Sequence, residues 1–174
     1  MKIRNLVLIS LLASSLTAGK TALAFLPNVE IVTLMCALYG YSFGLSGVAA
    51  SVIFVGIEIL IWGVGPWIIS YLIYFPILTL LFMLLNKKGV KNRFVLAAIA
   101  VGMTVLFGLL TSLVDIGLFS GHFENFGQRF IIYYLRGIPF YITQIICNAV
   151  LFPLLFPLLS EFLFKQKKKL FGKA

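Results

Sequence analysis

Runs of apolar residues, separated by only short breaks, fill almost the whole chain and restrict what it can fold into. Of the 174 residues, 61% are hydrophobic and 11% are charged, whereas a soluble domain carries about 25% charged residues. A chain of this composition has too few polar groups to cover a surface in water. The sequence therefore predicts an integral membrane protein that forms a single domain over residues 1–174.

The apolar runs predict an all-α bundle of six transmembrane helices. A helix needs about 20 apolar residues to cross the hydrocarbon core of a bilayer. The breaks between the runs contain glycine, proline or charged residues, and they lie at residues 27–28, 44–47, 63–66, 87–93 and 120–129. The predicted spans cover residues 5–26, 28–44, 46–62, 66–86, 93–118 and 131–163.

The net charge of +9 comes mainly from three groups of basic residues beside the predicted spans. Lys2 and Arg4 open the chain, a second group occupies residues 87–93, and a third occupies residues 165–173. Basic residues beside spans mark the cytoplasmic side of a membrane, so we expect both termini to be cytoplasmic. The basic residues are not interleaved with aromatic residues on a folded face, so the pattern does not indicate nucleic-acid binding.

The first 24 residues permit a second interpretation of the N-terminus. A basic start, an apolar stretch and an A-x-A sequence ending at Ala24 are typical of a secretory signal peptide. Cleavage there would leave five spans and an external N-terminus. Both interpretations leave the two later basic groups on the inner side.

The sequence predicts no enzyme activity, no cofactor and no metal site. Gly19-Lys20-Thr21 resembles the end of a phosphate-binding P-loop, but the glycine that the loop needs is replaced by Ser14. The single histidine, His122, has no set of ligands around it in the sequence, and the two cysteines lack metal-ligand spacing. No combination of nucleophile and base can be assembled from these residues.

Polar side chains inside the predicted last span point to a ligand site, because polar groups are costly in a bilayer and usually face a cavity or a partner. With Phe140 between them, these residues recur at intervals of three or four and share one helix face: Tyr133, Arg136, Gln144 and Asn148. Trp67 and Tyr71 are spaced in the same way on the fourth span. The sequence predicts an outward-facing pocket with aromatic walls, although aromatic residues at this depth also form interfacial belts without a ligand.

Glu58 is an acid among isoleucine, leucine and tryptophan residues of the third predicted span. A buried carboxylate needs a counter-charge or a ligand. We expect Glu58 either to bind the ligand or to neutralise Arg136 or Lys20.

Small residues recur every fourth position along the first predicted span, at Ser10, Ser14, Ala18 and Ala22. Such a stripe allows another helix to approach closely. The sequence leaves open whether that helix belongs to this chain or to a partner.

These features together resemble the substrate-binding S-component of energy-coupling factor (ECF) transporters. The resemblance extends over nearly the whole chain and depends on the order and spacing of loose motifs. These are Gly19-Lys20 after a short first span, LPNVEIVTL, the turn YSFGLSG, GVGPW before an inner basic loop, and FYITQIICNAVLFPLLFPLL near the end.

The resemblance implies a six-helix protein of the prokaryotic plasma membrane. Such a protein binds a vitamin or related micronutrient at the outer side and works with a transmembrane coupling subunit and two ATPases. The family's A-x-x-x-A stripe docks on the coupling subunit, which here implies an interface at Ser10, Ser14 and Ala18. Serine in place of alanine departs from the family pattern but stays small enough for close approach.

The resemblance also implies where the ligand is enclosed. It points to Asn28 and Glu30 in the first loop, to Trp67 and Tyr71, and to the polar residues of the last helix, Arg136, Gln144 and Asn148. The identity of the vitamin stays open. Two other functions fit the same residues: a structural or assembly protein with charges that join helices, and a stand-alone secondary transporter in which Glu58 carries a proton.

Overall fold

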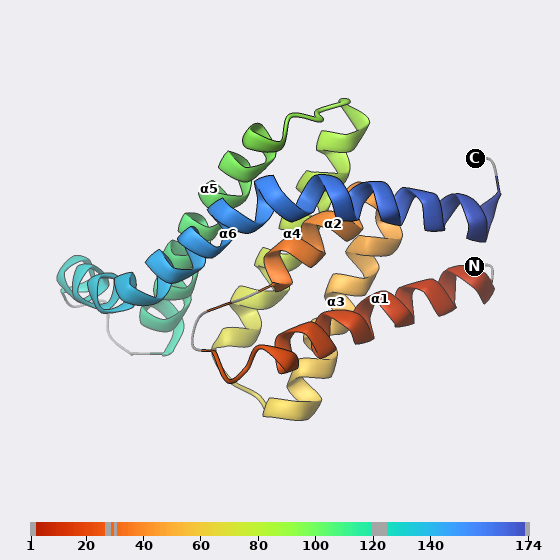
Figure 1. Ribbon diagram of the computed structural model, residues 1–174. Helices are drawn as coiled ribbons and strands as arrows, with labels where there is room; N and C mark the ends of the chain where they lie inside the picture. Colours follow the sequence, from red (N-terminus) through yellow and green to blue (C-terminus); the bar gives the residue numbers. More distant parts are fainter. Residues whose placement is uncertain (1–2, 27–28, 30, 120–124, 173–174) are drawn as a thin grey trace.

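The computed structural model describes residues 3–26, 29, 31–119 and 125–172, and this part of the chain forms helices and no strand. The elements, in chain order, are α1 (Ile3–Ala22), α2 (Val32–Phe43), α3 (Leu45–Trp62), α4 (Trp67–Lys87), α5 (Arg93–Val114), the π-helix η1 (Asp115–Phe119) and α6 (Phe126–Phe171) (Figure 1). The prediction of an all-α fold is confirmed.

Four helices are long and apolar enough to cross a membrane: α3, α4, α5 with its continuation η1, and α6. They are compatible with a multi-pass membrane protein. The other two predicted spans differ from this group. α2 has only 12 residues, and α1 is not among the four, so the count of six spans stays a prediction.

α2 lies at the centre of the bundle, where it packs against α1, α3, α4 and α6 (Figure 1). All of its residues except Met35 are buried, as expected for a helix that is apolar on every side. Two glycines allow its neighbours to approach closely. A Cβ atom on Gly40 would collide with the backbone carbonyl of Thr79 in α4, and one on Gly47 of α3 would collide with that of Tyr39.

The predicted breaks correspond to short connections with recognisable end signals. Gly44 alone separates α2 from α3, and its φ of 63° is a conformation that glycine adopts without strain. Gly63, with a φ of 79°, ends α3, and Pro66 precedes α4. Asn92 caps α5, since its side chain accepts hydrogen bonds from the backbone N–H groups of Phe94 (2.9 Å) and Val95 (3.4 Å).

α6 has 46 residues and extends beyond the predicted span of 131–163 at both ends. At 1.5 Å per residue it is about 69 Å long, more than twice the hydrocarbon thickness of about 30 Å. Arg136 and Lys165 are about 43 Å apart along this helix, a distance close to the 40–45 Å of a bilayer with its headgroups. The helix therefore has enough length to place both charges outside the hydrocarbon.

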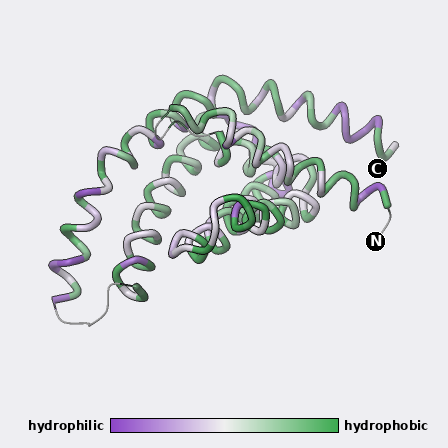
Figure 2. Tube along the Cα trace, turned by 90° about the horizontal axis from the view of Figure 1, so that it is seen from below, coloured by the Kyte–Doolittle hydropathy of each residue, from purple (hydrophilic) through white to green (hydrophobic). Residues whose placement is uncertain are grey.

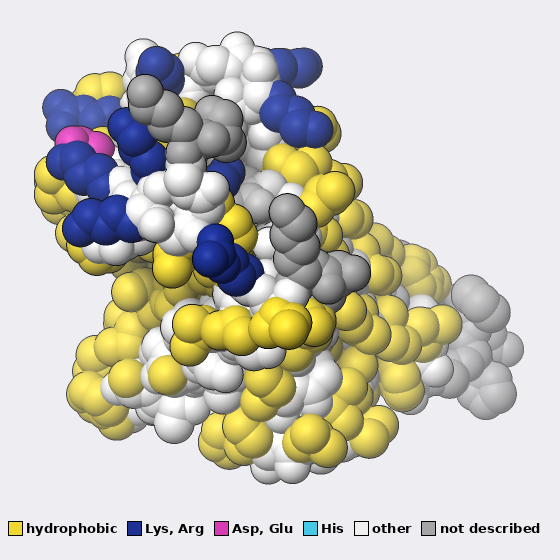
Figure 3. Space-filling view, turned by 90° about the vertical axis from the view of Figure 1, so that its right-hand side faces the viewer, with side chains coloured by type: hydrophobic (Ala, Val, Ile, Leu, Met, Phe, Trp, Pro, Cys, Tyr) yellow, Lys and Arg dark blue, Asp and Glu magenta, His cyan; other side chains and the backbone are white. Residues whose placement is uncertain are grey.

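The basic groups, far apart in the sequence, converge at one end of the molecule. A guanidinium N–H of Arg4 donates to the carbonyl of Leu170 (3.4 Å), and Lys167 donates to the carbonyl of Ser42 (2.9 Å). Lys91 and Arg93 line a groove beside the C-terminal part of α6. Figure 3 shows Lys and Arg side chains gathered over this end, and Figure 2 shows hydrophilic residues at the two chain ends and near the start of α6. The described part of each basic group thus belongs to one surface.

Candidate functional site

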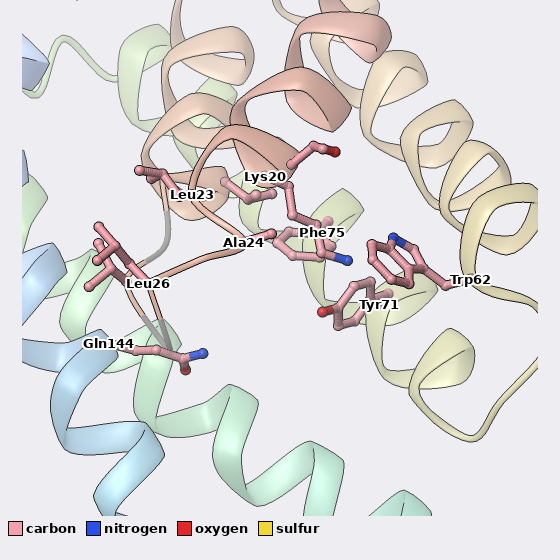
Figure 4. Close-up of a pocket in the computed structure, with 11 residues that line it drawn as sticks. Lys20, Leu23, Ala24, Leu26, Trp62, Tyr71, Phe75 and Gln144 are labelled. Atoms are coloured by element: carbon pink, nitrogen blue, oxygen red, sulfur yellow. The ribbon is translucent and has the colours of Figure 1, made fainter.

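A cavity of about 250 Å³ lies at the end of α1 away from the basic surface, between α1, α3, α4, α6 and the segment after α1 (Figure 4). One part of its wall is formed by the aliphatic side chains of Leu23, Ala24, Leu26, Val29 and Val32. The remaining wall contains its polar and aromatic side chains: Lys20, Thr21, Trp62, Tyr71, Phe75 and Gln144. The cavity combines apolar walls with a few polar groups, which is the usual composition of a small-ligand site.

Lys20, in the last turn of α1, forms an ion pair with Glu58 of α3. The Glu58 side chain is fully buried, whereas the Lys20 side chain is 32% exposed and reaches the cavity. A carboxylate buried to this degree needs a counter-charge, and Lys20 supplies it. This outcome matches one of the two partners that the sequence allowed for Glu58.

The ammonium group of Lys20 also lies over two aromatic rings of α4. Its Nζ atom is 5.1 Å from the ring centroid of Tyr71 and 5.9 Å from that of Trp67, within the range of a cation–π interaction. Trp67, Tyr71 and Phe75 follow each other at intervals of four residues and pack edge to face, with centroids 5.1 and 4.9 Å apart. One face of α4 is therefore an aromatic wall that holds the ammonium group beside the cavity.

Gln144 of α6 faces the cavity from the side opposite Lys20 and Tyr71 (Figure 4). Its Oε1 atom is buried and has no hydrogen-bond partner among the residues that the structure describes. A buried amide without a partner is costly, and in a cavity wall it is a place where a ligand can supply the missing hydrogen bond. Gln144 is thus a polar group of the cavity wall whose acceptor atom lacks a partner among the described residues.

The structure brings together four residues that the sequence predicted for the site: Glu58, Trp67, Tyr71 and Gln144. Gln144 and Tyr71 line the cavity, while Glu58 and Trp67 hold Lys20 in its wall. Asn28 and Glu30 lie outside the described residues. Asn148 is one turn deeper on α6, fully buried, and its amide donates to the Thr104 hydroxyl of α5 (3.0 Å).

Arg136 does not meet Glu58, and this alternative in the sequence prediction is wrong. Arg136 is exposed on α6, whereas Glu58 is paired with Lys20. The reason is the neighbourhood of α3, which packs on α1, α2 and α4, so that Glu58 meets a residue of α1. Tyr133 is 42% exposed and donates a hydrogen bond to Asp115 of η1 (2.6 Å), so it too lies outside the cavity wall.

Sequence reasoning missed Trp62, Phe75 and Thr21 as wall residues. Phe75 carried a usable signal, because it continues the four-residue spacing of Trp67 and Tyr71. Thr21 follows Lys20 directly. Trp62 ends α3 and faces the cavity from across the turn at 63–66, an arrangement that depends on how α3 and α4 meet.

The small-residue stripe of α1 faces outward. Ser10, Ser14 and Ala18 are exposed, whereas Leu12, Ala13 and Leu16 on the other side of the helix are buried in the core. The Ser10 hydroxyl donates to the carbonyl of Leu6 within the helix (3.0 Å), which lowers its polarity toward a neighbour. The stripe is therefore not used for packing within this chain.

Comparisons with known proteins find no match, since no family model, curated protein or solved structure is significantly similar to this chain.

Proposed function

We propose that this protein is a membrane-embedded binding subunit for the uptake of a vitamin or related small nutrient. In this proposal it crosses the prokaryotic plasma membrane six times with cytoplasmic termini, and it works with an ECF-type coupling subunit and two ATPases. The observation that carries the proposal is the double role of α1. Its last turn contributes Lys20 to the cavity, and its outer face presents the stripe of Ser10, Ser14 and Ala18.

The surface beside the stripe also favours a helical partner. Large apolar side chains of α1 are exposed there, with Ile3 at 79%, Val7 at 53% and Leu11 at 63%. An apolar groove of about 380 Å³ separates them from Leu170 and Phe171 at the end of α6. Small residues flanked by large apolar ones allow a partner helix to approach closely and bury area.

Copurification tests this proposal directly. The tagged chain, extracted in mild detergent from its native membrane, should bring down a transmembrane coupling subunit and two ATPases. Denaturation of the same sample should release a small molecule that mass spectrometry can identify. Recovery of the chain alone and without ligand, in a preparation where a known membrane complex survives, would contradict the proposal.

A stand-alone secondary transporter is the second candidate, and one observation favours it. The Oε1 atom of Glu58 is buried without a hydrogen-bond partner among the described residues, and a buried membrane carboxylate of this kind can carry a proton. Uptake by this chain alone in proteoliposomes, driven by a pH gradient and lost in Glu58→Gln, would establish this function instead.

A further inference from the structure

We infer that the cavity takes a compact, uncharged, planar aromatic molecule with a polar edge in preference to a carboxylate, a phosphate or an organic cation. The inference rests on the proposed function, since it names the class of ligand that the same cavity would bind. Three properties of the described wall lead to it: its charge balance, the position of Lys20 over the aromatic rings, and the unpartnered Oε1 atom of Gln144.

An anionic ligand is disfavoured because the positive charge in the wall is already matched. Lys20 is paired with Glu58. A carboxylate or phosphate that took Lys20 for itself would leave Glu58 fully buried without its counter-charge. Removing one partner of a buried pair is strongly unfavourable, so the ion pair acts against anions even though a lysine lines the cavity.

A cationic ligand is disfavoured for the complementary reason. Aromatic faces attract cations, but the faces of Trp67 and Tyr71 already interact with the Lys20 ammonium at 5.9 and 5.1 Å. A second cation at the same wall would be repelled by Lys20. An uncharged ligand disturbs neither the ion pair nor the cation–π contacts.

The shape and the hydrogen-bonding groups of the wall indicate a flat ring with a polar edge. The rings of Trp62, Tyr71 and Phe75 line one side of the cavity, and the amide of Gln144 lies opposite (Figure 4). An amide offers both acceptor and donor atoms, so it fits a ring that carries an N–H group or a carboxamide. A cavity of about 150 Å³ holds one benzene, so about 250 Å³ suits one substituted ring or two fused rings.

The two tryptophans provide a direct readout, because the chain has no others, Trp62 lines the cavity, and the Trp67 ring contacts Lys20 in its wall. Benzamide, benzoate and benzamidine share one shape and carry charges of 0, −1 and +1 at pH 7. Each is titrated against the purified full chain in detergent while tryptophan fluorescence is followed. We expect saturable quenching by benzamide with an apparent affinity at least tenfold tighter than that of the other two.

Three variants test the site, and a free fluorophore measures partitioning into the micelle. Gln144→Leu should weaken benzamide about tenfold, whereas Gln128→Leu, at an exposed position near the start of the same helix, should not change it. Glu58→Gln removes the charge that matches Lys20, so benzoate should then bind at least as tightly as benzamide. Quenching of N-acetyltryptophanamide in the same micelles gives the contribution of partitioning, which is subtracted.

Each outcome decides the inference. Tighter or equal binding of benzoate or benzamidine to the wild-type chain would overturn the ligand class, while the proposed binding function would stand. Absence of saturable quenching by all three probes would also overturn it, as would equal affinities in Gln144→Leu and Gln128→Leu. The proposed function fails by a different result, the absence of partner subunits and ligand in the copurification.

Discussion

The Lys20 ammonium and the Glu58 carboxylate form an ion pair that joins the last turn of α1 to α3 at the wall of the cavity. The pair is unequal, since Glu58 is fully buried while Lys20 is 32% exposed at its side chain. The two charges therefore depend on each other to different degrees. This asymmetry predicts that replacing Lys20 and replacing Glu58 lower the stability of the protein by different amounts.

Lys20→Met should destabilise the protein by about 3–5 kcal/mol, because it leaves the Glu58 charge buried and unpaired. Glu58→Gln should cost less, since Lys20 keeps contact with water and with the rings of Trp67 and Tyr71. The double variant should be more stable than Lys20→Met alone. Thermal unfolding of each variant in detergent measures these differences.

Arg136→Gln is the matched control for this series, because Arg136 is exposed on α6. Its unfolding temperature should equal that of the wild type. Strictly additive losses in the Lys20 and Glu58 double variant would show that these two charges do not interact.

Gly40→Ala should destabilise the bundle by about 3 kcal/mol, at the upper end of the usual cost of overpacking. The added methyl group would meet the backbone carbonyl of Thr79, which cannot move aside as a flexible side chain can, and overpacking in a tight core typically costs 1–3 kcal/mol. Gly56→Ala on α3 is the control, since its Cβ meets nothing within 4 Å and alanine favours a helix. Equal unfolding temperatures for the two variants would contradict the close packing of α2 on α4.

Sequence patterns alone predicted the helices with good boundaries where strong end signals exist. The turn at Gly63 and Pro66 and the cap at Asn92 are such signals, and the helices on either side begin and end there. They failed for α2. A helix that is apolar on all sides has the same sequence pattern whether it faces lipid or the interior of a bundle. The sequence therefore contained no sign that four neighbouring helices bury α2.

The types of residue in the candidate site were predictable from the sequence, but the ion-pair partner of Glu58 was not. Glu58 stood out as an acid in an apolar run, but the sequence offered Lys20 and Arg136 equally as partners. The choice depends on which helices are neighbours, and α3 packs on α1, α2 and α4. Arg136 lies on a helix too long to be confined to the bilayer, a property that becomes visible only when the whole of α6 is seen as one helix.

Cysteine labelling should place the basic surface on the cytoplasmic side. In a chain with Cys36 and Cys147 replaced by alanine, a membrane-impermeant maleimide added to intact cells should label Gln128→Cys and not Lys88→Cys. Both positions are exposed in the structure, so accessibility differs only by side of the membrane. Permeabilised cells should show labelling at both positions, and labelling of Lys88→Cys in intact cells would contradict the cytoplasmic placement.

Ser14→Trp should abolish assembly with partner subunits while ligand binding to the isolated chain stays close to that of the wild type. Ser14 is exposed on the outer face of α1, so a large ring there causes no clash within the bundle but prevents close approach of a partner helix. Ile53→Trp on α3 is the control, because Ile53 is also exposed, at 44%, and belongs to another helix. Pull-down of the coupling subunit and tryptophan-independent ligand binding by calorimetry measure the two properties separately. Assembly that survives Ser14→Trp but is lost in Ile53→Trp would move the docking surface from α1 to α3, and loss of ligand binding in Ser14→Trp would show that the stripe and the cavity are not independent.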